Sequence, residues 1–160
     1  MSNFEIRPLK KDDKDWVANL LTEWWASPAV VTPGGVHRAD ELPGFIASQD
    51  GRNVGLITYD IVGDRCEIVT MNSLVEGIGI GSALIDTVRE AAVAAGCRRL
   101  WLVTTNDNTH ALRFYQKRGF LLVAVHRNVV EQWRRTKPEI PYIGNDGIPV
   151  RDAIELEIFL

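Results

Sequence analysis

Apolar and polar residues alternate along this chain with two different periods, which together predict short strands interleaved with helices. In the strand-like segments every second residue is apolar, as Ile154, Leu156 and Ile158 are around Glu155 and Glu157. Strands are predicted at residues 4–9, 44–48, 54–62, 66–72, 100–103, 120–126 and 154–158. Helices are predicted from residue 12 or 13 to about 24, from about 80 to 95, and from 108 or 109 to 119.

The first predicted helix carries a stripe of large apolar residues along one side. Its members are Trp16, Val17, Leu20, Leu21 and Trp24. Their three- and four-residue spacing is typical of a helix face that is turned toward a core. We therefore expect Trp24 to be buried. Residues 26–43, which include three prolines and two glycines, are expected to form a long irregular connection with one short helix.

The order of these elements indicates an α/β fold, in which a mixed sheet has helices on both of its faces. The continuously apolar segment 100–103 is typical of a central strand that is covered on both sides. A chain of 160 residues has the length of one domain and can bury about 70% of its unfolded surface. We expect a single domain over residues 1–160, with a last strand at 153–160.

Composition narrows the class of protein. The 46% hydrophobic and 24% charged content is ordinary for a soluble protein, and a net charge of −3 without a Lys/Arg block favours no nucleic-acid partner. No apolar run approaches 18 residues and no secretory leader is recognisable, so we expect no membrane partner. Cys66 and Cys97 are predicted to be buried, reduced thiols of a cytoplasmic protein. The three histidines, His37, His110 and His126, lack metal-ligand spacing, so no metal is expected.

A segment with glycines at three alternate positions, residues 76–84, follows one predicted strand and opens the second helix. Glycine lets backbone N–H groups face an anion, and a helix N-terminus adds unpaired donors and a positive dipole end. The segment therefore predicts a phosphate site. A dinucleotide-binding turn would need a third glycine or alanine where Ser82 or Leu84 stands, and an acidic residue nearer than Asp107.

The same segment resembles the signature of the GNAT superfamily of N-acetyltransferases, Gln/Arg-x-x-Gly-x-Gly/Ala on a strand-to-helix turn. Gly79-Ile80-Gly81 matches the glycine half, whereas Glu76 puts a carboxylate where the family usually has Arg or Gln. Residues 108–120 are similar to a second family pattern, Asn-x-x-Ala-x-x-Phe-Tyr-x-x-x-Gly-Phe. The matching positions are Asn108, Ala111, Phe114, Tyr115, Gly119 and Phe120. The resemblance covers about residues 4–127 and favours this family over dinucleotide enzymes.

The resemblance implies a mostly antiparallel sheet whose strands splay apart at a site for acetyl-CoA, the cosubstrate. It also implies that the end of one strand, the glycine turn, Asn108 and Tyr115 bind this cofactor. The strand and turn residues are Met71, Asn72, Ser73, Gly77, Ile78, Gly79, Ile80, Gly81 and Ser82. A backbone N–H group of residues 71–73 would polarise the thioester carbonyl, and Tyr115 would act as the acid beside the departing thiolate.

Acetyl transfer to an amine further requires that the amine lose its proton. A Lys-like amine with a pKa near 10.4 is neutral in about one molecule per thousand near pH 7.4, which costs roughly 4 kcal/mol. Alternation places Glu67 on the strand face of Val69 and Met71, where its carboxylate could take the proton directly or through water. The alternatives are a solvent-facing Glu67 and a water chain without a side-chain base.

The acceptor pocket is expected beside residues 26–43, as the resemblance implies. Trp25 is the candidate for its wall. The acidic candidates for substrate binding are Glu23, Asp40 and Glu41. Carboxylates near this groove would attract an ammonium group, so we expect a neutral-to-basic amine rather than an acidic one. Arg38 lies in the same stretch and could reverse the local charge.

Residues 128–152 form a connection of about 25 residues where the resembling family often has a short one. Apolar residues within it argue against disorder, and a loop of this length is usually functional. Three alternatives remain open: a flap over the acceptor pocket, a subunit contact in a homodimer, and a packed cover. For the whole chain we expect an N-acetyltransferase acting on a primary amine of a small molecule or peptide. The alternative is a non-catalytic acyl-CoA-binding module.

Overall fold

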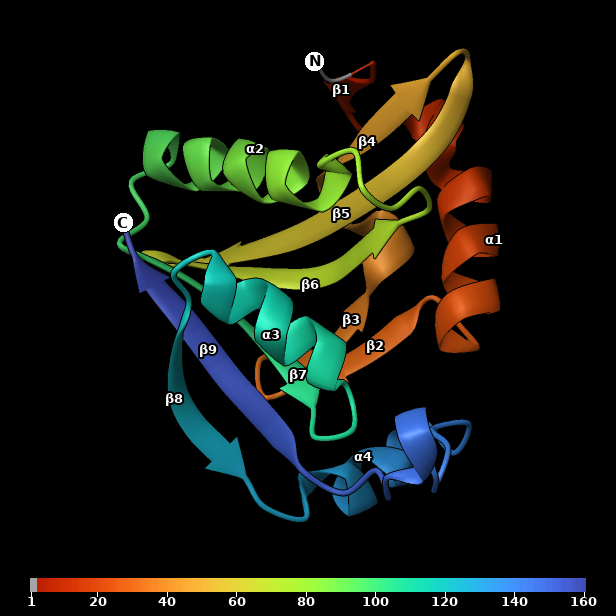
Figure 1. Cartoon of the computed structure of the whole chain (residues 1–160), viewed down its shortest axis with the longest axis vertical. Coiled ribbons are helices and arrows are strands. Elements are labelled where there is room, and N and C mark those ends of the chain that lie inside the picture. The colour runs from red at the N-terminus through yellow and green to blue at the C-terminus, as the bar shows by residue number, and fades with distance from the viewer. Residues whose placement is uncertain (1–2) are drawn as a thin grey trace.

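The computed structural model describes residues 3–160, in which seven strands form one mixed sheet in the order β1-β4-β5-β6-β7-β9-β8 (Figure 1). The strands are β1 Glu5–Pro8, β4 Gly44–Gln49, β5 Arg52–Val62, β6 Arg65–Ser73, β7 Arg99–Thr105, β8 Leu121–His126 and β9 Ala153–Phe159. A separate hairpin is formed by β2 Ala29–Thr32 and β3 Gly35–Arg38. This hairpin lies within the stretch for which an irregular connection was predicted. Its strands were not predicted because each has only four residues.

Helices lie on both faces of the sheet, which confirms the predicted α/β class. They are α1 Lys14–Trp25, α2 Ile80–Ala94, α3 Thr109–Lys117 and α4 Val129–Thr136, and the short 3-10 turns are η1 Lys11–Asp13, η2 Ala39–Glu41 and η3 Asn145–Gly147. The neighbouring β5 residues Leu56 and Ile57 face opposite ways, since Leu56 packs in the cluster with α1 and Ile57 in the cluster with α2. No helix within residues 3–160 is both long and apolar enough to cross a bilayer.

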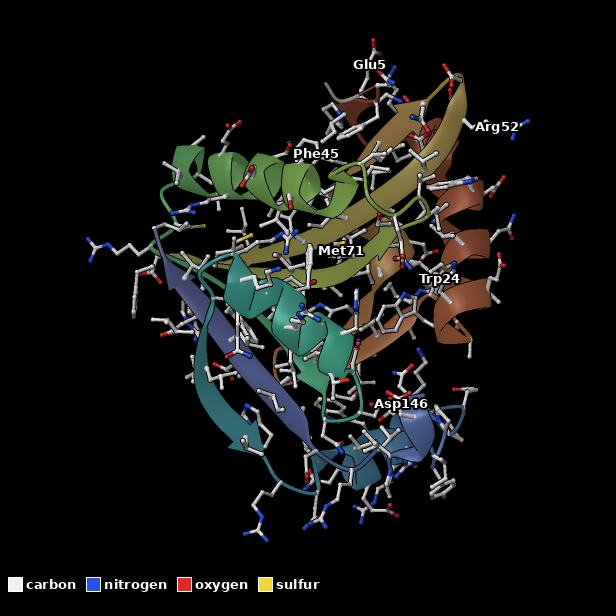
Figure 2. The ribbon with its side chains drawn as sticks, in the orientation of Figure 1. Glu5, Trp24, Phe45, Arg52, Met71 and Asp146 are labelled. Carbon is white, nitrogen blue, oxygen red and sulfur yellow. The ribbon has the colours of Figure 1, made fainter. Side chains whose placement is uncertain are left out.

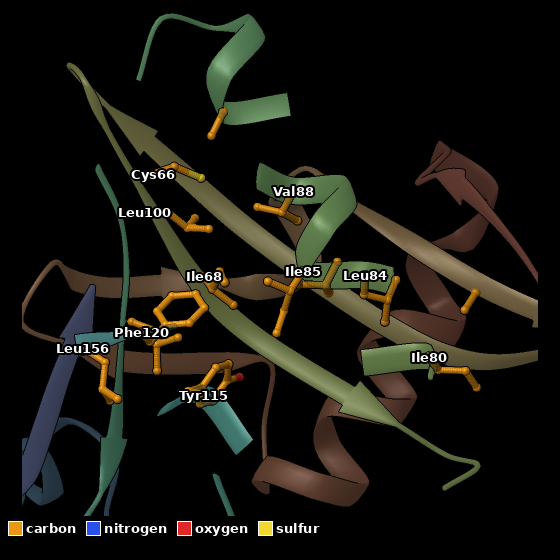
Figure 3. Close-up of a cluster of buried hydrophobic side chains, with 14 of the residues drawn as sticks. Cys66, Ile68, Ile80, Leu84, Ile85, Val88, Leu100, Tyr115, Phe120 and Leu156 are labelled. Carbon is orange, nitrogen blue, oxygen red and sulfur yellow. The ribbon is translucent and has the colours of Figure 1, made fainter. Parts of the chain in front are cut away.

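The larger hydrophobic cluster lies under α2 and α3 (Figure 3). Its buried members include Ile68, Ile80, Leu84, Ile85, Val88, Leu100, Tyr115, Phe120 and Leu156. The helical spacing predicted for α2 is therefore the spacing of its buried face. Cys66 and Cys97 are free and belong to the same cluster, where burial raises the pKa of the Cys66 thiol to about 12.

One opening in the sheet positions the candidate site. Strands β6 and β7 are parallel, whereas the other neighbouring pairs of this sheet are antiparallel. Their pairing covers only Arg65–Glu67 against Arg99–Trp101. Beyond these residues β7 continues to pair with β9 as far as Thr105, so that β6 and β7 diverge. The sheet is thus mixed, mostly antiparallel and splayed, as the sequence led us to expect.

A β-bulge at Val69 changes which face the later residues of β6 occupy. Across the ladder, Tyr59 opposes Ile68, Thr58 opposes Thr70, Ile57 opposes Met71 and Leu56 opposes Asn72. Val69 has no partner in this register, and such an extra residue interrupts the two-residue alternation. Glu67 and Val69 therefore face the α1 side, whereas Met71 faces the α2 side and packs on its cluster. The prediction that Glu67 and Met71 share a face was wrong for this reason.

Candidate active site

The opening between β6 and β7 widens into a cleft of about 880 Å³. Residues 68–73 and 102–105 form two of its walls, and the turn before α2, helix α3 and the end of α1 form the others. The predicted site residues that line the cleft are Met71, Asn72, Ser73, Gly77, Gly79, Ile80, Gly81, Ser82, Asn108, Tyr115 and Trp25. Ile78 packs against the larger hydrophobic cluster instead.

The glycine turn has the backbone geometry that binding of an anion would require. Gly77 and Gly79 have positive φ values of 81° and 84°, a region in which side chains with a Cβ are strained. Gly79 is the N-cap of α2, so the first N–H groups of this helix are without partners inside the helix. Gly81 serves a different purpose, because a Cβ there would lie 2.9 Å from Cζ of Phe114. Because Gly81 has no Cβ, the start of α2 can lie close to α3.

Three cationic side chains of α3 and the residue after it line the same cleft, namely Arg113, Lys117 and Arg118. Arg118 is held in place: its Nε donates to Oγ of Ser82 at 2.7 Å, and its guanidinium stacks on the Phe114 ring at 3.4 Å. These charges oppose the carboxylate of Glu76, which also lines the cleft. These three residues were not among the predicted site residues, although the four-residue spacing of Arg113 and Lys117 indicates that the two side chains share a helix face.

Tyr115 and Asn108 lie where the motif implied. The Tyr115 ring packs edge-on against Phe114 and Phe120, with centroids 5.2 and 5.4 Å away. Burial raises the pKa of the Tyr115 hydroxyl, which therefore stays protonated at neutral pH. Asn108 is the N-cap of α3, since its Oδ1 accepts from the backbone N–H of Ala111 at 3.1 Å. Both side chains border the cleft, so each can pack or cap and still meet a ligand.

Glu67 is buried at the vertex of the splay and does not line the main cleft. It lines a second cavity of about 350 Å³. Its Oε1 lies 3.2 Å from Nε2 of His37, which the β2–β3 hairpin brings over the sheet. Its Oε2 is buried and has no hydrogen-bond partner in residues 3–160. Nδ1 of His37 also lies 3.5 Å from Oδ2 of Asp60. The carboxylate is therefore buried beside a histidine and not solvent-facing.

His37 is expected to stabilise the fold more at pH 6 than at pH 9. Its hydrogen bond to Glu67 raises the pKa of His37 above the usual 6.5, although burial opposes this. The resulting stabilisation is complete below the unfolded pKa and disappears as the pH rises through the higher folded pKa. Urea unfolding of the wild type and of His37→Gln should show a larger difference in free energy at pH 6. An equal difference at both pH values would contradict the ion pair.

The two tryptophans at the end of α1 line the cleft, but the acidic acceptor candidates do not. Trp25 is 37% exposed, as expected of a pocket wall. Trp24 is 53% exposed, so the prediction that it is buried was wrong: the apolar stripe continues past the core into the cleft.

The acidic candidates Glu23, Asp40 and Glu41 lie outside the cleft, which corrects their predicted place beside the acceptor. Glu41 pairs with Lys14 at 3.6 Å, and Asp40 accepts from Arg38 at 3.2 Å. The 3-10 turn that carries Asp40 and Glu41 packs against α1 and so holds both away from the opening. Glu23 is exposed on α1.

Residues 128–152 form a fixed cover that also supplies part of the cleft wall. Nζ of the buried Lys137 donates to the carbonyl of Ala29 at 2.6 Å, and burial lowers the pKa of Lys137. Asp107, at the end of β7, accepts from the backbone N–H and the side-chain Nδ2 of Asn145 at 3.0 and 2.9 Å. Pro141 and Asn145 line the cleft. Among the three alternatives, these contacts favour a packed cover that borders the pocket.

Comparisons with known proteins agree with this geometry. The sequence model of the Acetyltransferase (GNAT) family matches residues 5–120. The chain is 44% identical over 150 residues to the uncharacterized protein YdhI of Bacillus subtilis (strain 168), covering 93% of this chain and 94% of that protein. An IAA acetyltransferase from Bacillus cereus ATCC 14579 superposes with a TM-score of 0.75 at 22% identity, over 98% of this chain and 99% of that one. A GNAT family acetyltransferase from Elizabethkingia anophelis with acetyl-CoA bound superposes with a TM-score of 0.72 at 20% identity, over 100% of both chains.

Proposed function

The chain belongs to the GNAT acetyltransferase family, and from this premise we propose that it transfers an acetyl group from acetyl-CoA to a primary amine. The amine attacks the thioester directly, without an acetylated enzyme. The acceptor is an amine of a small molecule or peptide. This proposal is carried by one observation, the splay of β6 from β7 beside a glycine turn.

The splay leaves backbone donors for the reacting carbonyl. Because β7 no longer pairs with β6 after Glu67, the N–H groups on that edge of residues 68–73 have no strand partner in the described chain. In a pleated strand such donors point along the plane of the sheet, into the opening. The N–H of Met71 or of a neighbour within 71–73 is suited to polarise the thioester carbonyl and to stabilise the negative charge that develops on its oxygen.

The pyrophosphate of the cofactor would lie on the glycine turn. The unpaired N–H groups at the start of α2 and the positive end of its dipole favour an anion there. Arg118, bonded to Ser82 at this turn, adds a fixed positive charge. Arg113 and Lys117 extend this charge along the cleft. Together the three cations outweigh Glu76, so the departure from the family signature does not leave the site negative.

Tyr115 would act on the departing sulfur. A phenol with a raised pKa is a weaker acid than a thiol of pKa about 8.5, so it stabilises the thiolate through a hydrogen bond more than by complete proton transfer. We expect Tyr115→Phe to fold, to bind CoA nearly as the wild type does, and to lose roughly 10- to 100-fold in kcat. Steady-state kinetics of thiol release between pH 7 and 9 measures this. Full activity of the variant throughout that range would exclude the role.

The acceptor's proton would leave toward Glu67. The carboxylate faces the α1 side of β6, as Val69 does, and Val69 borders the cleft. A buried oxygen without a partner, such as Oε2 of Glu67, needs a hydrogen bond. A water between this oxygen and the cleft would supply it and would also relay the proton. Glu67 would thus be a base that acts through water.

The test of the proposed function is thiol release from acetyl-CoA with a panel of amines. The panel should contain polyamines, aminoglycosides, peptides with free N-termini and free amino acids at equal concentrations, and we expect thiol release with at least one of these amines. Thermal shift with CoA and with NAD should show stabilisation by CoA alone. Binding of CoA without thiol release from any amine would favour the non-catalytic acyl-CoA-binding module.

We place the reaction in the cytoplasm, because Cys66 and Cys97 are both free thiols. A reducing compartment keeps cysteines in this state. Whether the protein works as a homodimer stays a prediction, which light scattering of the purified protein tests.

A further inference from the structure

Asn72 is an unusual residue for the interior of this protein. The residue is 2% exposed, and neither Oδ1 nor Nδ2 of its side chain has a hydrogen-bond partner in residues 3–160. Burial of an amide without hydrogen bonds is unfavourable, because its donor and acceptor lose their hydrogen bonds to water. Its strand neighbour Thr70 is different, since its Oγ1 lies 2.6 Å from Oγ1 of Thr58. The hydroxyl of Thr70 is thus satisfied within the chain, whereas the amide of Asn72 needs a partner from outside residues 3–160.

Asn72 lines the cleft, and its side chain lies on the face of β6 that is turned toward α1. Asn72 opposes Leu56, and Leu56 packs in the cluster formed with α1. The bulge at Val69 sets this orientation, because it places Asn72 and Met71 on opposite faces. Trp24 extends from α1 toward the same cleft (Figure 2). The α1 side of the opening thus combines one unpaired amide with two exposed indole rings, those of Trp24 and Trp25.

The cationic side chains of the cleft lie on the α3 side and not on the α1 side. The cations Arg113, Lys117 and Arg118 come from α3 and its C-terminal end, and Arg118 is bonded to the glycine turn. On the opposite wall, Trp24 and Trp25 carry no charge. Within residues 3–160, no lysine or arginine of α1 lines the cleft, so an acceptor carboxylate would meet no such cation beside the two tryptophans. An amide, by contrast, donates and accepts hydrogen bonds and suits a neutral polar group.

We propose that Asn72 is a specificity-determining residue that recognises the acceptor through its side-chain amide. The acceptor class is a primary amine with an aromatic or apolar body and a neutral hydrogen-bonding group, such as a carboxamide, beside the amine. The body lies against Trp24 and Trp25, and the neutral polar group pairs with both amide atoms of Asn72. This assignment rests on the proposed acetyltransferase function and names the part of the same site that selects the amine.

The test compares three probe acceptors that differ in one group: phenylalaninamide, phenylalanine and phenethylamine. The wild type should prefer phenylalaninamide in kcat/KM over both others. Asn72→Leu keeps a similar volume and removes both polar atoms. We expect the ratio of kcat/KM for phenylalaninamide to that for phenethylamine to fall roughly 10- to 100-fold in this variant, the usual loss for an unmade hydrogen bond in a buried site. The dissociation constant of CoA should stay within about threefold, because the cofactor is expected to meet the backbone N–H groups of residues 71–73, which leucine retains.

A matched control separates recognition from structure. Thr58→Val breaks the hydrogen bond to Thr70 on the same face, but Thr58 does not line the cleft. This variant should lose stability in urea and keep the acceptor ratio, whereas Asn72→Leu should be at least as stable as the wild type.

An unchanged ratio in Asn72→Leu would overturn the assignment and leave the acetyltransferase proposal intact. If none of the amines supported thiol release by the wild type, the proposed function would be overturned, and the assignment of Asn72 with it.

Discussion

Replacement of Gly79 by valine is expected to weaken CoA binding severely while the protein still folds. Gly79 has a φ of 84°, and a Cβ built there meets no atom within 4 Å, so the new side chain would project into open space at the cleft. There it would cover the N–H groups that are to receive the pyrophosphate. We expect the dissociation constant of CoA to rise at least about 100-fold, because removing charge-assisted hydrogen bonds costs about 1.5–3 kcal/mol each. Isothermal titration calorimetry measures it directly.

Gly63 offers a control for the backbone strain that Gly79→Val introduces. It also has a positive φ, 62°, and a Cβ there also meets no atom within 4 Å, but it lies in the turn between β5 and β6 and does not line the cleft. Gly63→Val should lower stability by a similar amount and leave CoA affinity unchanged. If both variants bound CoA equally well, the glycine turn would not be the phosphate site. Gly81→Val is a poorer test, because its Cβ would meet Phe114 at 2.9 Å and disturb packing.

Glu67→Gln is expected to lower kcat/KM for the amine by roughly 100- to 10,000-fold at pH 7, the range for loss of a general base. Glutamine keeps the shape and a hydrogen bond to His37 but can no longer take a proton. The loss should shrink as the pH approaches the amine's own pKa, because solvent then supplies the neutral amine. A pH–rate profile from pH 6.5 to 10 measures both effects. CoA affinity should not change, since Glu67 lies outside the cleft.

His37→Gln shows whether the effect of Glu67 is chemical or structural. This variant removes the imidazole that lies 3.2 Å from Oε1 of Glu67 and leaves the carboxylate in place. If Glu67 acts as the base, His37→Gln should keep most of the activity and lose stability instead. Equal losses in both variants would indicate that the pair only supports the fold. Unchanged activity of Glu67→Gln at every pH would mean that water alone removes the proton.

The elements and residues that the sequence placed correctly depend on short-range physics. The helical period of α2 and the N-cap at Asn108 follow from contacts three or four residues apart. The positive φ values of Gly77 and Gly79 follow from the conformational freedom of glycine at a strand-to-helix turn. The motif also predicted correctly that Tyr115 lies at the cleft, because the position where a helix begins determines which of its residues face the sheet.

Short-range periodicity failed where a distant segment decides the outcome. The strand alternation that predicted the face of Glu67 assumed an unbroken β6, but a bulge exists only relative to the partner strand β5. Trp24 follows the apolar stripe of α1, yet whether the last turn of a helix covers core or cleft depends on where the sheet opens. Asp40 and Glu41 were predicted beside the acceptor pocket but lie outside the cleft, because their turn packs against α1.

The sequence by itself therefore determined the family, the α/β class and the conformation of the glycine turn, because each depends on residues that are neighbours along the chain. Only the tertiary structure decided which side chains share a cavity. It paired Glu67 with His37 from the β2–β3 hairpin and bonded Asp107 to Asn145 across 38 positions. It also left the amide of Asn72 without a hydrogen-bond partner among residues 3–160. Such relations come from packing between segments far apart in the chain, and no local pattern of hydrophobic and polar residues records them.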